Sequence, residues 1–245
     1  MASLSRPAAA APAGSRLYAI GDVHGRADLL EALLGEIAAD GARHPAAEKR
    51  LIYLGDYVDR GPDSSAVIDL VLRVAPRGFS VVPLMGNHEE MMLRFLDDIA
   101  VGRTWMMNGG DATLRSYGVE APGMFSGTAA FRQAQQRFAE RLPARHRSFL
   151  EALEVMRVEG DYLFVHAGLR PGVPLDEQQP EDLLWIRDEF LESTRDFGKV
   201  VVHGHTITLD PEFRPNRIGI DTGAYRSGQL TCLVLEGTKR QLLTT

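Results

Sequence analysis

The sequence contains a single cysteine, Cys232, among its 245 residues. One thiol cannot form an intrachain disulfide, so disulfide-stapled secreted folds are excluded, and we expect a cytoplasmic protein in a reducing compartment. Cys232 lies within the apolar run 230–235, which predicts a strand. We therefore expect a buried structural thiol and not a catalytic nucleophile.

Long apolar runs and an excess of basic charge are also lacking. No stretch reaches about 18 apolar residues, so we expect no transmembrane helix and no membrane partner. Asp and Glu (33) outnumber Lys and Arg (27), which gives a formal net charge of −6. That balance argues against a protein that binds nucleic acid through a basic surface. Taken alone, it would also disfavour an anionic substrate.

Short apolar runs alternate with helical patterns along the chain. Helical spacing of apolar residues covers 28–40, 88–100, 128–142 and 144–156. Six apolar runs predict strands: residues 17–20, 51–54, 80–85, 162–165, 199–202 and 217–220. A seventh run, 230–235, is expected to pair beside the sixth through the turn at 227–228. The β-α-β alternation predicts an α/β fold with a mixed sheet.

The predicted organisation is one catalytic domain over residues 16–245, preceded by a disordered tail over 1–15. Residues 102–157 contain helical patterns but no convincing strand, so we interpret them as a helical insert within that domain. No length remains for a separate regulatory domain, and we expect a monomer.

Each of six predicted strands is followed by a segment that carries Asp, Asn or His, usually beside glycine. Ligands of open α/β sheets lie at the carboxyl ends of the strands, so these side chains are predicted to converge on one rim. The segments, in chain order, are GDVHG (21–25), GDYVDRG (55–61), GNHE (86–89), VHAG (165–168), HGHT (203–206) and DTG (221–223).

This mixture of side chains indicates a metal site. Carboxylate, amide and imidazole groups without cysteine form an oxygen and nitrogen ligand set. Such a set is typical of a manganese, iron or zinc site and not of a thiolate site. Seven or so such groups are too many for one tetrahedral ion, whereas two ions bridged by one carboxylate would use them all. We expect two divalent ions, with manganese first. Their charge would set the local field that an anionic substrate meets, whatever the net charge.

These motifs, in this order, resemble the calcineurin-like metallophosphoesterases. The sequence is most similar to the phosphoprotein (serine/threonine) phosphatases, in their small bacterial and phage-type branch, over residues 17–235. The resemblance implies mixed β-sheets in a sandwich flanked by helices. A second histidine of the wider superfamily is replaced by Ile207, as in the phosphoprotein phosphatases. The implied ligands are Asp22 and His24 for the first metal, Asp56 as the bridge, and Asn87, His166 and His205 for the second.

The resemblance also implies a catalytic apparatus outside the ligand set. Asp59 and His88 would form an acid pair that protonates the leaving group, while Arg60 and Arg187 would bind the phosphate oxygens. A hydroxide activated by the two metals would attack phosphorus directly. The roles of three further residues stay open: His203, Asp221 and Tyr225.

Three functions remain as hypotheses. The first is dephosphorylation of phosphoserine or phosphothreonine in proteins. The second is hydrolysis of symmetrical dinucleoside tetraphosphates, although those relatives carry Ala at the position of Asp59 and Asp at that of Glu89, which favours the first. The third is a non-catalytic metal-binding interaction module. Within the insert, the stretch from Trp105 to Asp111, with its Gly109-Gly110 pair, is predicted to form a cleft wall that contacts the group attached to phosphate; a structural turn is the alternative.

Overall fold

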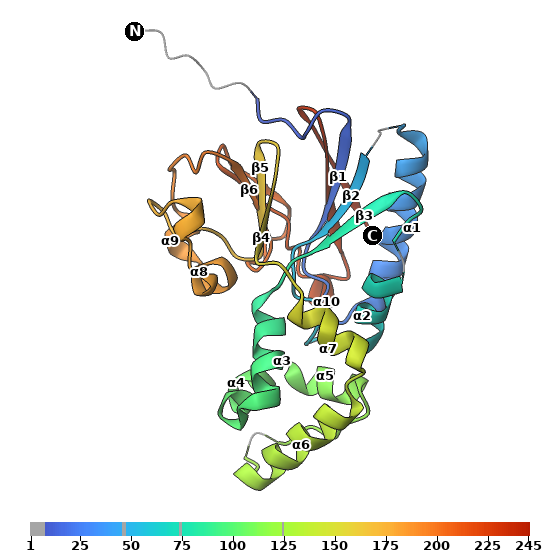
Figure 1. The fold of residues 1–245 in the computed structure, drawn as a ribbon, viewed down its shortest axis with the longest axis vertical. Coiled ribbons are helices and arrows are strands. Elements are labelled where there is room, and N and C mark those ends of the chain that lie inside the picture. Colours follow the sequence, from blue (N-terminus) through green and yellow to red (C-terminus); the bar gives the residue numbers. More distant parts are fainter. Residues whose placement is uncertain (1–7, 46–47, 74, 124) are drawn as a thin grey trace.

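The computed structural model describes residues 8–45, 48–73, 75–123 and 125–245 (Figure 1). Two five-stranded sheets face one another. The first has the order β10-β9-β1-β2-β3: Lys239–Thr244, Thr231–Glu236, Ser15–Ile20, Glu48–Tyr53 and Phe79–Pro83. The second has the order β4-β5-β6-β8-β7: Met156–Glu159, Tyr162–Val165, Val200–His203, Arg217–Gly219 and Glu212–Phe213. Both sheets mix parallel and antiparallel pairs, so the predicted fold class is confirmed.

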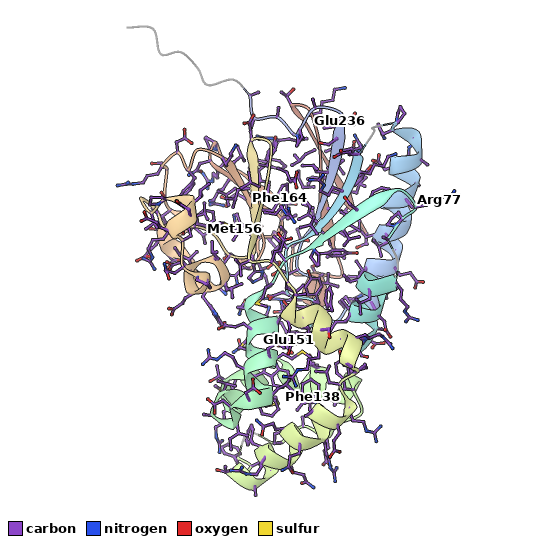
Figure 2. The ribbon with its side chains drawn as sticks, in the orientation of Figure 1. Arg77, Phe138, Glu151, Met156, Phe164 and Glu236 are labelled. Carbon is purple, nitrogen blue, oxygen red and sulfur yellow. The ribbon has the colours of Figure 1, made fainter. Side chains whose placement is uncertain are left out.

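The central strands are apolar where both of their faces are buried, as over residues 17–20 of β1 and 51–53 of β2. In β1, Leu17 and Ala19 point into the core between the two sheets, and Tyr18 and Ile20 point toward the helices outside. Figure 2 shows Phe164 of β5 in the layer between the sheets. The two sheets are therefore held together by one continuous apolar layer.

Helices cover the outer faces of the sandwich (Figure 1). The outer face of the first sheet packs against α1 (Ala27–Arg43) and α2 (Ser64–Arg73), whereas α3 (Asn87–Asp97) leaves the sandwich and packs against the helices of the insert (Figure 1). The second sheet packs against α8 (Pro180–Trp185) and α9 (Asp188–Leu191). A 3-10 turn (Leu175–Glu177) and the short helix α10 (Ala224–Ser227) lie in the connections.

The helical insert extends from the end of the sandwich opposite the N-terminus (Figure 1). It follows a 3-10 turn (Ile99–Val101) and contains α4 (Gly102–Met107), α5 (Gly110–Ser116), α6 (Thr128–Arg141) and α7 (Ala144–Glu151). Phe138 lies among these helices (Figure 2) and belongs to the same core as the outer face of the first sheet. The boundary prediction was two residues too long, since Met156 already begins β4.

The predicted pairing of the seventh strand was wrong. β9 lies in the first sheet between β1 and β10, and not beside β8. The chain crosses between sheets through α10, and Gly223 and Gly228 on either side of it have positive φ angles of 67° and 75°. Glycine adopts this backbone without strain. The sequence pattern gave no signal for this change of sheet, for β10, or for the short strands β4 and β7.

The predicted disordered tail is not found over residues 8–15, the part of the tail that the structure describes. Residues 1–7 lie outside the described part, but Ala11 N–H donates to the Gly237 carbonyl at 2.8 Å and Ala10 N–H to Asp161 Oδ2 at 3.0 Å. Ser15 already belongs to β1. Ala11 is buried between the sheets, and Cys232 is buried as predicted. No described helix is long and apolar enough to cross a membrane.

Candidate metal centre

The polar segments predicted from the sequence meet at the carboxyl ends of the strands. Asp22 follows β1, Asp56 follows β2, and Asn87 and His88 open α3 after β3. His166 follows β5 and His205 follows β6. All of these side chains are buried, as is His24. The two sheets thus deliver six predicted ligands and one predicted acid to a single place.

Backbone strain is concentrated in the same place. Five residues other than glycine have positive φ in the described part of the chain, at angles between 45° and 72°, and each is a predicted site residue: His24, Asp56, Asp59, Arg60 and His205. Such conformations cost about 1–3 kcal/mol each and persist only where the surrounding structure imposes them. The strain therefore marks the loops that position these side chains.

Asp56 lies between two groups of imidazoles. Its Oδ2 is 3.4 Å from His24 Nε2, and its Oδ1 is 3.4 Å from His166 Nε2. Each carboxylate oxygen thus faces a different group, which is the arrangement that a bridging ligand needs. Two sets of side chains have ligand atoms close enough for one ion each: His24, Asp56 and His88, and Asp56, His166 and His205.

His24 and His166 both direct Nε2 toward Asp56. His24 Nδ1 and His166 Nδ1 lie 2.8 and 2.9 Å from the Val58 and Leu54 carbonyls, where they donate. These bonds fix the tautomer that leaves Nε2 as an acceptor. Burial lowers the pKa of both residues. Burial and His166 lower the pKa of His205 to about 2. All three rings are therefore neutral at pH 7, as metal ligands must be.

The second group is completed by an amide oxygen. Asn87 Oδ1 lies 2.9 Å from His166 Nε2 and 3.0 Å from His205 Nδ1, and these two ring nitrogens are 3.1 Å apart. Burial opposes ionisation of Asp56, but His166 and the other imidazoles hold its pKa below the ordinary value. An anionic bridge among neutral nitrogen and amide oxygen donors suits a divalent ion.

Two buried polar atoms of this cluster lack a hydrogen-bond partner within the described residues, namely Asp22 Oδ1 and His205 Nε2. Leaving such atoms unpaired is costly, so each indicates a missing partner. Burial, together with Asp221 and Asp56, also raises the pKa of Asp22 well above its ordinary value. A cation would remove both penalties. The residues present therefore fit a dinuclear divalent centre.

Asp59 and His88 form a buried pair beside this cluster. Asp59 Oδ2 lies 2.6 Å from His88 Nδ1, which donates to it. Although burial opposes protonation, Asp56 and Asp59 raise the pKa of His88. His88 Nε2 is 3.9 Å from Asp56 Oδ2. This geometry suits the predicted acid, but a carboxylate-bound imidazole is also typical of a metal ligand.

Asp22 was predicted as a ligand of the first metal, but it lies outside the close set of His24, Asp56 and His88.

The insert holds Asp59 in place, which the sequence did not predict. Trp105 Nε1–H donates to Asp59 Oδ2 at 2.9 Å, and the Thr113 hydroxyl donates to Asp59 Oδ1 at 2.6 Å. Both side chains are fully buried. The only signal was the Gly109-Gly110 pair, where Gly109, at φ 99°, accepts a bond from Arg60 N–H at 3.2 Å. The insert therefore positions the acid pair and Arg60.

We expect Trp105→Phe to lower kcat about 10- to 100-fold on an alkyl phosphomonoester, because a hydrogen bond to a charged group contributes about 1.5–3 kcal/mol. Trp105 is a positioning residue, so metal content and KM should stay unchanged. Tyr117→Phe is the matched control: it removes a buried bond to His146 in the same core, 2.8 Å long, without touching Asp59. Equal kcat losses in both variants, measured with melting temperatures, would refute the positioning role.

Glu89 organises the loop that carries Asp56. Its carboxylate accepts four backbone N–H groups, from Asp56, Tyr57, Val58 and Gly86, at 2.8–3.2 Å. The side chain is fully buried, and burial together with Asp56 raises its pKa to about 8. Glu89 therefore fixes the local backbone and does not touch the centre itself.

The two predicted phosphate-binding arginines differ in placement. Arg60 Nη1 lies 2.9 Å from His24 Nε2, and its guanidinium stacks over the Tyr225 ring with 5.0 Å to the centroid. Arg187 is exposed and makes only long contacts, 3.4 Å to the His205 carbonyl and 3.3 Å to the Thr206 hydroxyl. Arg60 is thus inside the site, and Arg187 stands at its edge and is free to reach a substrate.

The three residues without a predicted role also have definite places. His203 is buried against Phe190 and near Arg217, away from the close sets, with a ring centroid 5.1 Å from that of Phe190. Tyr225 packs edge-on against His24, 5.4 Å between centroids. Asp221 is buried beside Asp22, and burial, reinforced by Asp56, raises its pKa to about 6. Tyr225 and Asp221 therefore border the centre, and His203 does not.

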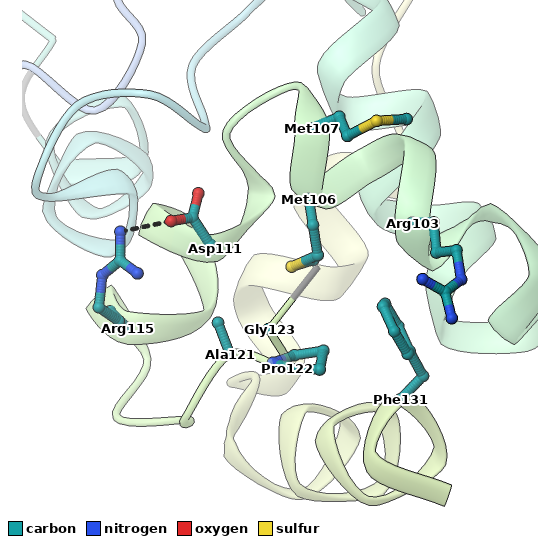
Figure 3. Close-up of a pocket in the computed structure, with 9 residues that line it drawn as sticks. All are labelled: Arg103, Met106, Met107, Asp111, Arg115, Ala121, Pro122, Gly123 and Phe131. Atoms are coloured by element: carbon teal, nitrogen blue, oxygen red, sulfur yellow. Dashed lines mark hydrogen bonds and ion pairs between the residues drawn. The ribbon is translucent and has the colours of Figure 1, made fainter. Parts of the chain in front are cut away.

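The insert also contains a cavity of about 390 Å³, lined by Met106, Met107 and Phe131 among others (Figure 3). Asp111 forms an ion pair with Arg115 at one side of it, 2.8 Å long. Asn108 Nδ2 donates to the Thr104 carbonyl of its own helix. None of the cavity's lining residues is a predicted ligand. The cavity is therefore separate from the metal centre, and the insert's contact with a leaving group stays a prediction.

Comparison with known proteins agrees with this fold and site. The calcineurin-like phosphoesterase family matches residues 15–225. The chain is 29% identical over 235 residues to an asymmetrical bis(5'-nucleosyl)-tetraphosphatase PrpE of Anoxybacillus flavithermus, covering 87% of this chain and 88% of the relative. It is 29% identical over 222 residues to serine/threonine-protein phosphatase 1 of Salmonella typhimurium, covering 88% and 89%.

Among solved structures, a putative diadenosine tetraphosphatase superposes with a TM-score of 0.65 at 20% identity, covering 96% of this chain and 95% of that one. The similarity supports the fold. Fold and site together define a metal-dependent phosphoester hydrolase. The chain belongs to the calcineurin-like phosphoesterase family. The family prediction is confirmed, whereas the relatives divide between nucleotide and phosphoprotein substrates.

Proposed function

We propose that the protein is a serine/threonine protein phosphatase. The observation that carries the proposal is the buried Asp59–His88 pair, in which Oδ2 and Nδ1 are 2.6 Å apart. An alkoxide is a poor leaving group, so hydrolysis of phosphoserine or phosphothreonine gains from a positioned acid. A nucleotide phosphate leaves as a stabilised anion, so its hydrolysis is accelerated much less by a positioned acid. A built acid pair therefore favours the alkyl ester.

The chain's own residues divide the work as follows. His88 donates from Nδ1 to Asp59, so Nε2–H is the proton that passes to the departing oxygen. Arg60 and Arg187 bind the phosphate oxygens, for which the planar guanidinium fork is suited. The cleft is buried among the strand ends, which strengthens each of these interactions.

The metal ligands we propose are Asp22 and His24 for one ion, Asp56 as the bridge, and Asn87, His166 and His205 for the other. When bound, two divalent ions lower the pKa of water and offset the charge of the phosphate. Manganese is our first choice, with iron and zinc compatible with the same donors. The proposal includes a cytoplasmic, monomeric enzyme.

A cavity beside Arg187 supports a peptide substrate. It has a volume of about 420 Å³, and Trp185 lines it next to Arg187. Its charged lining comprises two arginines and four acids, the latter being Glu181, Asp182, Asp188 and Glu189. Two of these acids already pair with Arg170. A net acidic wall repels a polyphosphate chain and favours a peptide with basic residues near the phosphate.

Hydrolysis of dinucleoside tetraphosphates is the second candidate, because relatives with that name match most of the chain. A metal-supplemented panel separates the two: a phosphoserine peptide, diadenosine tetraphosphate and a phosphodiester, compared by kcat/KM at one Mn²⁺ concentration. We expect the peptide to be preferred by at least tenfold. Dominant cleavage of the dinucleotide would replace the proposal with the second candidate, and no turnover of any substrate would favour a binding module.

A further inference from the structure

We infer that Asp221 is a further ligand group of the metal centre, acting together with Asp22 on the ion of the first metal position. The inference presupposes the metal centre of the proposed function. Asp221 follows β8 (Arg217–Gly219) through Ile220, so it lies at the carboxyl end of a strand, as do the proposed ligands. The proposed ligand set and acid pair leave two acidic residues of these strand-end segments unused, Glu89 and Asp221, and Glu89 is already satisfied by four backbone N–H groups.

The first observation is an orphaned oxygen. Asp221 is 2% exposed, and its Oδ1 accepts the Gly223 N–H at 2.8 Å. Its Oδ2 is buried and has no hydrogen-bond partner within the described residues. A turn-forming aspartate would need only the first of these oxygens. The second oxygen is buried without a hydrogen-bond donor or cation beside it, so its loss of hydration is not offset by any interaction.

The second observation is that Asp22 shows the same defect. Asp22 is also 2% exposed, its Oδ2 accepts the His205 N–H at 3.0 Å, and its Oδ1 has no partner in the described part of the chain. Each of the two buried carboxylates thus has one oxygen tied to the backbone and one oxygen unpaired. The matching pattern points to a shared partner.

The backbone is shaped to bring the two acids together. A Cβ on Gly21 would lie 2.7 Å from the Ile220 carbonyl oxygen, so only glycine lets the ends of β1 and β8 approach this closely. A Cβ on Gly204 would lie 2.0 Å from Asp22 Oδ1 itself. Gly204 thus keeps side-chain atoms away from the orphaned oxygen of Asp22, and Gly21 lets the backbone around Asp221 come close to the end of β1.

No side-chain cation neutralises the pair. Within 8–45, 48–73, 75–123 and 125–245, neither Asp22 nor Asp221 forms an ion pair with an arginine, lysine or histidine. Burial raises the pKa of both acids and the charge of Arg60 acts against this rise, but its guanidinium is directed at His24 Nε2 and pairs with neither carboxylate. Two like charges buried side by side are unfavourable, and in the metal-free protein a proton shared in a hydrogen bond between the Asp221 and Asp22 carboxyls relieves that repulsion in part. A bound divalent ion would replace this proton and meet both carboxylates.

The test is Asp221→Asn, in which the amide oxygen still accepts the Gly223 N–H. Apoprotein prepared with a chelator is titrated with Mn²⁺ by calorimetry, and its melting temperature is measured without metal. We expect Mn²⁺ affinity at one of two positions to fall about 10–100-fold. We expect the metal-free protein to melt about 2–4 °C higher than wild type, because the repulsion with Asp22 is removed. Asp221→Ser should give the same pair of changes.

Asp40→Asn is the matched control. Asp40 is equally buried, but its Oδ2 is paired with Arg16 Nη2 at 2.8 Å. The same substitution there should lower the apoprotein melting temperature and leave both Mn²⁺ affinities unchanged. Wild-type affinity and stoichiometry in Asp221→Asn would overturn the inference, and so would weaker binding accompanied by a lower apoprotein melting temperature. Neither readout uses catalysis, so failure of the phosphopeptide assay would not affect the result.

Discussion

Asp56→Asn is expected to reduce kcat/KM about a thousandfold and to lower the bound metal from two ions to one or none. The carboxylate faces His24 Nε2 and His166 Nε2 at 3.4 Å each, so it serves both halves of the centre. An amide is neutral and offers one oxygen, so it cannot bridge two cations. The loss of about 4 kcal/mol of transition-state stabilisation corresponds to that factor.

The measurement combines metal analysis of the purified variant with kcat/KM on p-nitrophenyl phosphate at saturating Mn²⁺. Asp63→Asn is the matched control, since Asp63 Oδ1 accepts the Ala66 N–H at the exposed start of α2, outside the proposed ligand set. That control should retain two metals and most of its activity. An Asp56→Asn enzyme with two bound ions and a wild-type rate would show that the bridge is misassigned.

The convergence of the site could be predicted because each contribution is local in sequence. Asp22, Asn87 and His166 directly follow apolar strands, and strand ends in such folds meet on one rim. What the sequence could not provide is the pairing between distant segments. β9 carries the same alternation whichever neighbour it pairs with, so its place beside β1 depends on the crossing through α10.

The sequence also did not predict which residues hold the Asp59–His88 pair in place. Trp105 and Thr113 lie 46 and 54 residues from Asp59, and no sequence pattern connects either of them with it. Their function becomes visible only when α4 and α5 fold back over the loop that carries Asp59. Asp221 was seen at a strand end, but its unpaired Oδ2 is a property of packing that no local pattern contains.

His88→Ala is expected to lower kcat about 100- to 10,000-fold on a phosphoserine peptide, since it removes the proposed acid. The loss on p-nitrophenyl phosphate should be much smaller, because nitrophenolate leaves without a proton. Bound metal should remain at two ions per chain. His146→Ala is the matched control: His146 is fully buried and lies 3.0 Å from Asp69 Oδ1, but it belongs to the insert. Its effect should not depend on the leaving group.

The same variant decides between the two roles that geometry permits for His88. Its ring is bonded to Asp59 and belongs to a close set with His24 and Asp56, which is compatible with either an acid or a ligand. An acid predicts a leaving-group-dependent rate loss at full metal content. A ligand predicts one ion fewer and equal losses on both substrates. The second result would make Asp59 the carboxylate that orients a metal-bound imidazole, and it would remove the observation on which the protein phosphatase proposal rests.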